Sequence, residues 1–515
     1  MTAPITNSRK WGTLVISCLA MLLLALDLTV LHLAAPKLVE DMAPTGTQLL
    51  WILDMYGFAL AGLLITMGNL GDRIGRKRLL LIGTAAFGAA SVLTAYAPTP
   101  ELLIAARTLL GVAGATIMPS TLSIVRNVFT NPKERTAAVG LWSSVSALGF
   151  AVGPVVGGLL LDHFWWGSVF LINVPITAGL LLGGLLVLPE SRNPRSRPLD
   201  LVSVPLSMAG VIGLVYALKA AAHDGLGHPG FWISAAIGLT AMVVFVRRQT
   251  RLAEPLIDVR LFRLPAFSGS IGANLVVIFS SLAMSVAFAQ YFQLVRGWSP
   301  LMAGLAGLPG GVSGAIGGGL AGVLVGAIGR ARVVALGVLL TAAGFFIYTG
   351  IGLDTSYWYL LPAMMVFGVG LGFTFAVTND TLLASVPRER AGAASAIAET
   401  AQEVGGSLGI AVLGSVLGAL YRQNLTLPPG FPAEAKESLG ATLHAASTLP
   451  AQLGDALALT ARQTFVDSMR VSMLIGGTLL AVFSVVVLYA LRSVPKEIPE
   501  VDLDDEGRVQ DQVPA

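Results

Sequence analysis

Residues 68–78 read Gly-Asn-Leu-Gly-Asp-Arg-Ile-Gly-Arg-Lys-Arg. This short basic stretch lies between two apolar runs, at 50–68 and 79–97. Each run has about the length, roughly 20 residues, that a helix needs to cross the ~30 Å hydrocarbon core of a bilayer. The stretch therefore predicts a loop between two membrane-spanning helices, with its positive charges on the cytoplasmic side.

Apolar runs of this kind recur along the whole chain. Of its 515 residues, 55% are hydrophobic and only 12% are charged, whereas a soluble domain carries about 25% charged residues. We interpret the runs as helices, because a helix satisfies its own backbone polar groups in lipid. Fourteen spans are predicted, at 12–34, 50–68, 79–97, 101–123, 136–161, 167–189, 201–220, 230–248, 268–293, 301–326, 333–352, 358–382, 391–421 and 470–492.

The lysines and arginines support this topology. An even number of spans puts both termini on one side, and we place them in the cytoplasm. Twenty-four of the 32 Lys and Arg residues then fall on the cytoplasmic side, as the positive-inside rule requires. The chain is thus predicted to be a multi-pass membrane protein with both termini in the cytoplasm.

The basic stretch has a second copy. Residues 322–332 read Gly-Val-Leu-Val-Gly-Ala-Ile-Gly-Arg-Ala-Arg, at a shift of 254 residues. Segments 132–138 and 387–393 also resemble each other, at a shift of 255. Two repeats at nearly one offset predict two copies of a six-helix bundle with the transport path between them.

The repeats divide the chain into parts. An N-terminal six-helix bundle is predicted over 1–200, two inserted helices over 201–248, and a C-terminal six-helix bundle over 249–495. The last bundle includes a long extracytoplasmic loop at 422–469 with alanine-rich helical stretches. The acidic segment 496–515 is predicted to be a disordered cytoplasmic tail. The fold class is an all-α polytopic membrane protein.

Four segments resemble motifs of the major facilitator superfamily. Residues 68–77 are similar to its loop 2–3 signature and residues 107–114 to its helix 4 pattern. Residues 149–158 are similar to the helix 5 pattern of antiporters, and residues 26–30 to the helix 1 pattern of fourteen-helix members. The chain is identified as a member of the fourteen-helix drug:proton antiporter branch, similar to exporters of the QacA, SmvA and LfrA type.

The resemblance implies a multi-pass transporter of the bacterial inner membrane and not an enzyme. It implies export of lipophilic cations (quaternary ammonium compounds, dyes and biguanide antiseptics) in exchange for protons, by alternating access. The expected partners are these small molecules, protons and membrane lipid; no cofactor, metal or nucleic acid is expected, and we expect a monomer. Export of an endogenous lipid, siderophore or antibiotic is the alternative, which a mostly neutral cavity would favour.

An intramembrane enzyme or sensor is the alternative from another class. It would need a nucleophile–base pair or a metal cluster within the spans, and the sequence has neither His-Glu-x-x-His nor Cys-x-x-Cys. The sequence also lacks the Gly-x-x-x-x-Gly-Lys-[Ser/Thr] motif of ATP-driven systems. We therefore expect no enzyme.

Charged residues within the spans are the candidate functional groups. A charge at the bilayer centre costs at least ~2.5–3.5 kcal/mol, so each one calls for a reason. The candidates are Asp27, Asp54, Arg107, Asp380, Glu399 and Glu403. Five acids against one base suit a cation or a proton and repel an anion.

Glu399 and Glu403 are the central pair. They lie one helical turn apart and so share a face, with Glu399 about 12 Å into its span. Two like charges on an apolar face disfavour full ionisation, so these carboxyls can hold protons and release them when a cation arrives. The alternative is that they only hydrogen-bond polar neighbours such as Gln402, or that Glu403 meets water.

The other acids have weaker sequence support. For Asp27, in the outer half of the first span, the resemblance implies proton or cation handling, and a contact with the hydroxyl of Thr29 or with a neighbouring helix is the alternative. Asp54 begins the second span, where an acid also compensates the helix dipole. Trp51 is a candidate stacking face for a cation or an interfacial belt residue. Asp380, near the cytoplasmic end of its span, is a candidate that could simply reach water.

Further residues are expected to act in coupling. The resemblance implies that Arg107 influences proton release by lying near a carboxylate, with the satisfaction of backbone carbonyls as the alternative. It also implies that Asp72, Arg73 and Gly75 form a latch that ties helices 2 and 11 together when the outside is open. Because the second copy lacks the Asp and Arg, the latch is expected to work from the first half only.

Span 136–161 contains two residues with expected structural roles. Gly153 allows close helix packing in lipid. Pro154 removes a backbone donor and is expected to kink the helix.

Overall fold

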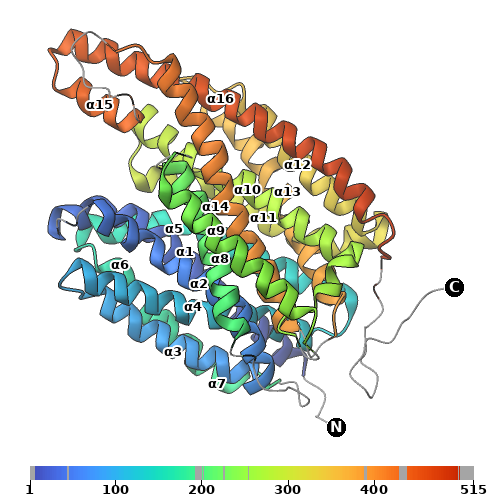
Figure 1. Ribbon diagram of the computed structural model, residues 1–515. Helices are drawn as coiled ribbons and strands as arrows, with labels where there is room; N and C mark the ends of the chain where they lie inside the picture. The colour runs from blue at the N-terminus through green and yellow to red at the C-terminus, as the bar shows by residue number, and fades with distance from the viewer. Residues whose placement is uncertain are drawn as a thin grey trace.

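The computed structural model describes residues 6–42, 44, 46–191, 200, 202–223, 227–252, 255–387, 391–427, 436, 438–496 and 498. These residues are almost entirely helical and contain no β-strand (Figure 1). The helices are α1 (Asn7–Met42), α2 (Gly46–Ile74), α3 (Arg76–Ala95), α4 (Pro100–Val128), α5 (Pro132–His163), α6 (Ser168–Leu171), α7 (Asn173–Val187), α8 (Ser203–His223), α9 (Pro229–Gln249), η1 (Val259–Arg263), α10 (Pro265–Gln290), η2 (Tyr291–Val295), α11 (Pro300–Ile328), α12 (Arg330–Tyr348), α13 (Tyr357–Ala384), α14 (Ala391–Asn424), α15 (Leu439–Ser447) and α16 (Ala451–Ala490).

The lengths and compositions of the helices confirm a polytopic membrane fold. Eleven helices within the described residues are long and apolar enough to cross a bilayer. Each of the fourteen predicted spans overlaps a helix, and span 167–189 overlaps the pair α6 and α7. The count of fourteen spans and the cytoplasmic location of both termini stay predictions.

Two apolar cores lie in the two halves of the chain. The first is built mainly on α1 to α5 with α7, and the second on α10 to α16. The halves meet along two seams, where α5 packs against α11 and α13, and α2 packs against α14. The predicted domain boundaries at 200, 248 and 495 stay predictions.

The repeated basic stretches share a backbone conformation. Gly75 separates α2 from α3 with φ +113°, and Gly329 separates α11 from α12 with φ +88°. Positive φ is costly for residues with a Cβ and open to glycine. Gly329 is the counterpart of Gly75 at the 254-residue shift, so the sequence repeat is also a structural repeat.

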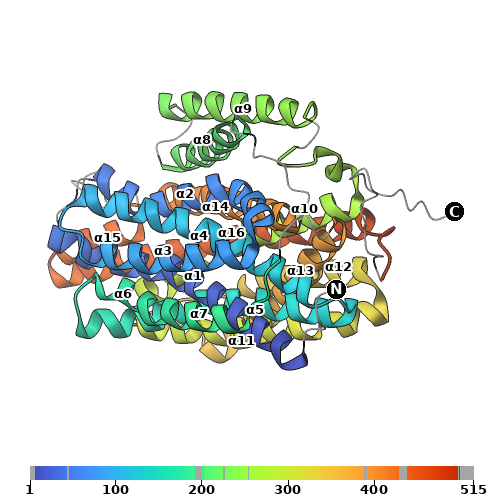
Figure 2. The ribbon, with the colours of Figure 1, turned by 90° about the horizontal axis from the view of Figure 1, so that it is seen from below.

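The helices α8 and α9 form an added pair outside the two cores. Figure 2 shows them on the outer side of α2 and α14, and α8 contacts both helices. The base of the pair is closed by Asp200, whose Oδ2 and Oδ1 accept hydrogen bonds from Arg248 Nε (2.6 Å) and Nη2 (2.9 Å). These hydrogen bonds hold the pKa of Asp200 below its usual value. The insert therefore covers the seam between α2 and α14.

Helices also occupy much of the predicted loop 422–469. Helix α15 lies within it, and α16 begins at Ala451, nineteen residues before the predicted span 470–492. The segment 451–469 is rich in alanine and leucine, which favour helix. The predicted tail 496–515 lies outside the described residues except for Lys496 and Ile498.

Candidate functional site

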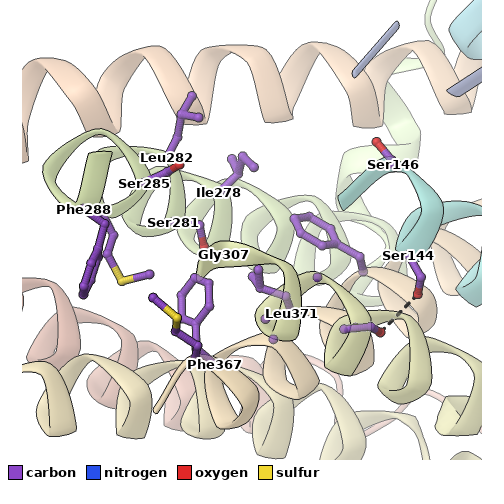
Figure 3. A pocket seen from close by; sticks show the side chains of 18 of the residues that line it. Ser144, Ser146, Ile278, Ser281, Leu282, Ser285, Phe288, Gly307, Phe367 and Leu371 are labelled. Atoms are coloured by element: carbon purple, nitrogen blue, oxygen red, sulfur yellow. Dashed lines mark hydrogen bonds between the residues drawn. The ribbon is translucent and has the colours of Figure 1, made fainter. Parts of the chain in front are cut away.

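A cavity of about 330 Å³ lies mainly within the C-terminal half. Its walls come from α10 with the adjoining η2, from α11 and from α13, and α1, α5, α12 and α14 add single residues or short groups. It extends from Asn379 and Ser143, near the predicted cytoplasmic ends of their helices, to Phe292 and Ala303, near the opposite ends of theirs. Figure 3 shows Phe288, Ser281 and Ser285 of α10 around the same space as residues of α11 and α13.

The walls of the cavity are aromatic and sulfur-rich. Aromatic rings, thioethers and aliphatic groups offer a large polarisable surface to a flat organic molecule. The aromatic and methionine residues are Met21, Trp142, Met284, Phe288, Phe292, Tyr348, Met364, Phe367 and Phe375. Hydroxyl and amide groups, such as those of Ser285 and Gln402, supply a few neutral polar contacts.

Glu399 gives this cavity its charge. Among the described residues of the lining it is the only Asp, Glu, Lys, Arg or His. Its side chain is buried, at 4% exposure, and Oε1 has no hydrogen-bond partner among the described residues. A carboxyl group without a counter-charge in an apolar wall attracts a cation far more strongly than the same group in water would.

Glu403 lies one turn further along α14 and is half-buried. It is not part of the described lining, but its charge acts on Glu399. The structure thus brings one acid of the predicted pair to the cavity and leaves the other beside it. The proton-coupling roles of both stay predictions.

Asp27 lies in a separate, fully buried polar cluster. Its Oδ2 accepts a hydrogen bond from Arg107 Nη1 (2.9 Å), and its Oδ1 accepts one from Asn173 Nδ2 (2.9 Å). Asn173, at the start of α7, also donates to Ser91 Oγ (3.1 Å). The guanidinium of Arg107 lies over the ring of Tyr56, 4.7 Å from its centroid. The predicted closeness of Arg107 to a carboxylate is present, and that carboxylate is Asp27.

Two other candidates lie near the outer end of α2. Trp51 is 37% exposed and stacks on Tyr216 of α8, with ring centroids 6.0 Å apart. It also meets Phe58 edge-on at 6.1 Å. Trp51 is therefore placed between α2 and the inserted pair, outside the described cavity lining. Asp54 lies on α2, and its side chain is outside the described part of the structure.

Asp380 joins the two halves at the predicted cytoplasmic end. It is fully buried, so the expectation that it could reach water is wrong. Its Oδ1 accepts a hydrogen bond from Arg135 Nε of α5 (2.6 Å), and its Oδ2 lies 2.8 Å from Arg330 Nη2 of α12. Thr136 also donates to Oδ2 at 2.7 Å. Two guanidinium groups already neutralise this carboxylate, which places it in a contact between the halves.

Asp72 makes a second contact between the halves at the same end. Its oxygens accept hydrogen bonds from the backbone N–H groups of Gly392 (3.1 Å) and Ala393 (3.3 Å), in the first turn of α14. Arg76 also donates to Asp72 at 2.8 Å, whereas Arg73 is exposed. An acid at a helix N-terminus is stabilised by the helix dipole and the free N–H groups.

The contact of Asp72 with the other half differs from the expected latch in three ways, and its role as a latch stays a prediction. Its helix is α14, which matches the thirteenth predicted span and not the eleventh, because the inserted pair shifts the count by two. The arginine in contact with Asp72 is Arg76 and not Arg73. Asp380 adds a separate contact between the halves, in which the second copy of the repeat takes part through Arg330; that the latch itself works from the first half only stays a prediction. Gly75 lies at the turn between α2 and α3.

The contacts of Asp380 lead to a prediction. Asp380→Asn leaves Arg135 and Arg330 buried without their counter-charge, which costs about 3–5 kcal/mol for a buried pair. We expect a lower thermal unfolding temperature in detergent. We also expect faster labelling of Ser143→Cys, at the end of the cavity, by a membrane-impermeant thiol reagent added from the cytoplasmic side in a Cys18→Ser background. The exposed Asp162 supplies a matched control, Asp162→Asn, which should change neither value.

Gly153 has the packing role expected from the sequence. A Cβ at this position would lie 1.8 Å from Thr29 Oγ1 of α1, so only glycine allows α5 to approach α1 this closely. Helix α5 runs without interruption from Pro132 to His163. The side chain of Pro154 lies outside the described part of the structure, and the expected kink stays a prediction.

Sequence reasoning missed several residues of the site. Arg135 and Arg330 had no assigned role, although both lie in the repeated segments. The repeats were the sequence signal that could have identified them. Asn379 lines the cavity and donates from Nδ2 to Ser143 Oγ of α5 (3.2 Å). Tyr56, under Arg107, lies within the predicted span 50–68 and had no assigned role. In uniformly apolar spans, the sequence does not distinguish aromatic residues that face the cavity from those that face lipid.

Comparisons with known proteins agree with this architecture. The sequence profile described as Major Facilitator Superfamily matches residues 17–410. The multidrug efflux pump LfrA of Mycolicibacterium smegmatis is 42% identical over 95% of this chain and 97% of its own length. The methyl viologen resistance protein SmvA of Salmonella typhimurium is 36% identical over 94% of this chain and 98% of its own length.

A solved structure shares the fold. The human organic anion transporter MFSD10 superposes with a TM-score of 0.57 over 92% of this chain and 98% of its own, at 14% sequence identity. The chain therefore belongs to the Major Facilitator Superfamily, as a multi-pass transporter of the bacterial inner membrane.

Proposed function

We propose that this protein is a proton-coupled multidrug efflux antiporter that exports lipophilic cations by alternating access. The observation that carries the proposal is Glu399, a carboxyl group with no counter-charge among the described residues that line an aromatic, methionine-rich cavity. The curated relatives support it, since one is called a multidrug efflux pump and another confers resistance to methyl viologen, an organic cation.

The cavity suits a flat cation better than a neutral or anionic molecule. Aromatic faces such as those of Phe288 and Phe367 attract cations through the ring quadrupole, by about 0.5–2 kcal/mol per contact. The carboxylate of Glu399, which lines the same cavity, supplies the counter-charge. An anion would meet Glu399 without any basic residue in the described lining to compensate.

Protons and cations can compete for the same carboxyl. A buried acid without a partner is stable when it carries a proton, because the neutral form avoids the desolvation cost of the charge. A bound cation stabilises the ionised form instead. One proton leaves Glu399 for each monovalent cation that binds there, and a proton from outside reloads it after release.

The contacts at the predicted cytoplasmic end fit the alternating-access part of the proposal. Asp72 and Asp380 hold the halves together there, while the cavity reaches towards the opposite ends of α10 and α11. Release of these contacts would allow the halves to rock and open the cavity to the cytoplasm. In this motion each half moves as a unit, so the cavity with Glu399 changes the side to which it opens while the apolar core of each half stays intact.

Efflux of a fluorescent cation tests the proposal. In everted membrane vesicles that contain the protein, we expect ethidium uptake to begin when a pH gradient, acidic inside, is imposed. Collapse of the pH gradient and of the membrane potential with ionophores should reduce the rate at least about tenfold. Each elementary charge moved across 100 mV represents about 2.3 kcal/mol, so a coupled process depends steeply on these gradients.

A neutral aromatic dye such as Nile red serves as the matched comparison, and vesicles without the protein give the background. Uptake of ethidium that continued unchanged after both gradients had been collapsed would exclude proton antiport. Preference for the neutral dye over ethidium would favour export of an endogenous neutral compound.

A further inference from the structure

Tyr56 lies between the charged sites of the two halves. It is on α2 and fully buried, and its hydroxyl has no hydrogen-bond partner among the described residues. A buried hydroxyl without a partner costs roughly 1–3 kcal/mol, and the phenylalanine ring would fill the same space without this cost. A purely structural role therefore does not explain the hydroxyl group.

The charged groups that face the phenol come from three helices. Arg107 of α4 lies over the ring, and Asp27 of α1 is the ion-pair partner of this arginine. Glu403 of α14 acts on the phenol from the other half of the molecule. The charge of Glu403 in turn acts on Glu399 in the cavity wall. These groups form a series that begins at Glu399 in the cavity wall, continues through Glu403 and Tyr56, and ends at the Arg107–Asp27 pair. Tyr56 is the residue that α2 contributes to this series.

The register of α2 and α14 supports this placement. The two helices are antiparallel neighbours, and Gly68 lies against Gly392 and Ala396. At 1.5 Å per residue, Tyr56 is then about 18 Å along α2 from Gly68. The same distance along α14 from Gly392 ends at position 404. Tyr56 and Glu403 therefore lie at the same depth on facing helices.

Helix α4 leaves room for the hydroxyl. A Cβ at Gly114 would lie only 3.1 Å from Tyr56 Oη, closer than a comfortable van der Waals contact. The glycine therefore leaves space beside the hydroxyl, within which the O–H group can turn.

We propose that Tyr56 is a positioning residue that couples the charge state of Glu403 to the Asp27–Arg107 pair. When Glu403 is ionised, the phenol O–H donates a hydrogen bond to its carboxylate and draws α14 towards α2. When Glu403 is protonated, this hydrogen bond is lost, and the ring remains under Arg107. The phenol keeps its own proton throughout, so no covalent bond changes. This inference rests on the proposed antiport function and adds the link by which Asp27, outside the cavity, senses the acids of α14.

The test is Tyr56→Phe, which keeps the ring under Arg107 and removes only the hydroxyl. We expect unchanged or slightly higher thermal stability and unchanged equilibrium binding of ethidium to the purified protein. Proton-driven ethidium efflux should fall roughly tenfold, the effect of losing a hydrogen bond to a charged group. The pH profile of efflux should move to higher pH, because the lost donor had favoured the ionised carboxylate.

A double-mutant cycle ties the effect to Glu403. In a Glu403→Gln background, Tyr56→Phe should cause no further loss of efflux, because the charged acceptor is absent. If the two substitutions reduce efflux independently, so that their effects multiply, the proposed contact is excluded. Wild-type efflux and an unchanged pH profile in Tyr56→Phe would overturn it as well.

Tyr421 is the matched control. Its hydroxyl is also buried, but it shares a hydrogen bond with Thr442 Oγ1 (2.7 Å). Tyr421→Phe should lower thermal stability and leave the pH profile unchanged; an equal shift of the profile would show that the shift is not specific to Tyr56. The proposed function is tested separately by wild-type protein and Glu399→Gln in the same assay. If these show coupled efflux that Glu399→Gln abolishes while Tyr56→Phe behaves as wild type, only the role of Tyr56 fails.

Discussion

Glu399→Gln is expected to abolish nearly all ethidium efflux while the protein folds as stably as the wild type. The substitution removes the only acidic or basic group in the described lining and keeps the size of the side chain. Loss of one partner of a buried charge pair costs about 2–5 kcal/mol, which corresponds to at least about a 30-fold weaker interaction. Stability should be unaffected, because Oε1 makes no hydrogen bond to a described residue and a neutral amide is cheaper to bury than a charge.

Three measurements on the same preparations check this result. Ethidium binding to purified protein, ethidium uptake by everted vesicles and thermal unfolding in detergent separate recognition, transport and folding. Glu134→Gln supplies the matched control, since Glu134 is exposed and outside the described cavity lining. Full efflux by Glu399→Gln would move the proton-exchange site away from the cavity without affecting the assignment of the fold.

Asp27→Asn is expected to cause a large loss of stability together with a loss of efflux. It leaves Arg107, with 2% of its side chain exposed, without its counter-charge. Removing one partner of a buried ion pair costs about 3–5 kcal/mol. The affected contacts join α1, α4 and α7, because Asn173 also bonds Asp27. We expect a markedly lower unfolding temperature and loss of efflux.

A double substitution separates the structural role of this pair from its role in coupling. Asp27→Leu with Arg107→Met replaces the ions by apolar side chains, a change that is often neutral or stabilising for a buried pair. We expect the unfolding temperature to recover while efflux stays absent. Recovery of proton-driven efflux would show that the pair serves stability alone. The exposed pair Asp467–Arg470 is the control; Asp467→Asn should cost less than about 1 kcal/mol.

The intramembrane acids have different surroundings that their sequence positions did not distinguish. Glu399 faces the cavity, Asp27 is paired with Arg107, and Asp380 is held by two arginines. Glu399 and Glu403 could be recognised as a pair because helical periodicity alone places them on one face. Arg107, the partner of Asp27, is 80 residues away from it in the chain, and Arg135, a partner of Asp380, is 245 residues away. No local sequence pattern could therefore assign these pairs.

The sequence by itself determined the helical membrane fold, the repeat and the family. These follow from local physics, because lipid requires self-satisfied backbone segments of a set length and the repeated basic loops keep their spacing. Only the tertiary structure decided which charges meet. It showed that Asp72 of the loop signature at 68–78, paired with Arg76, contacts the start of α14. It also showed that one acid, Glu399, is present in the described lining of the cavity. The physical reason is that charge pairing and cavity lining depend on how distant helices pack, and apolar helices of similar composition leave that packing unspecified.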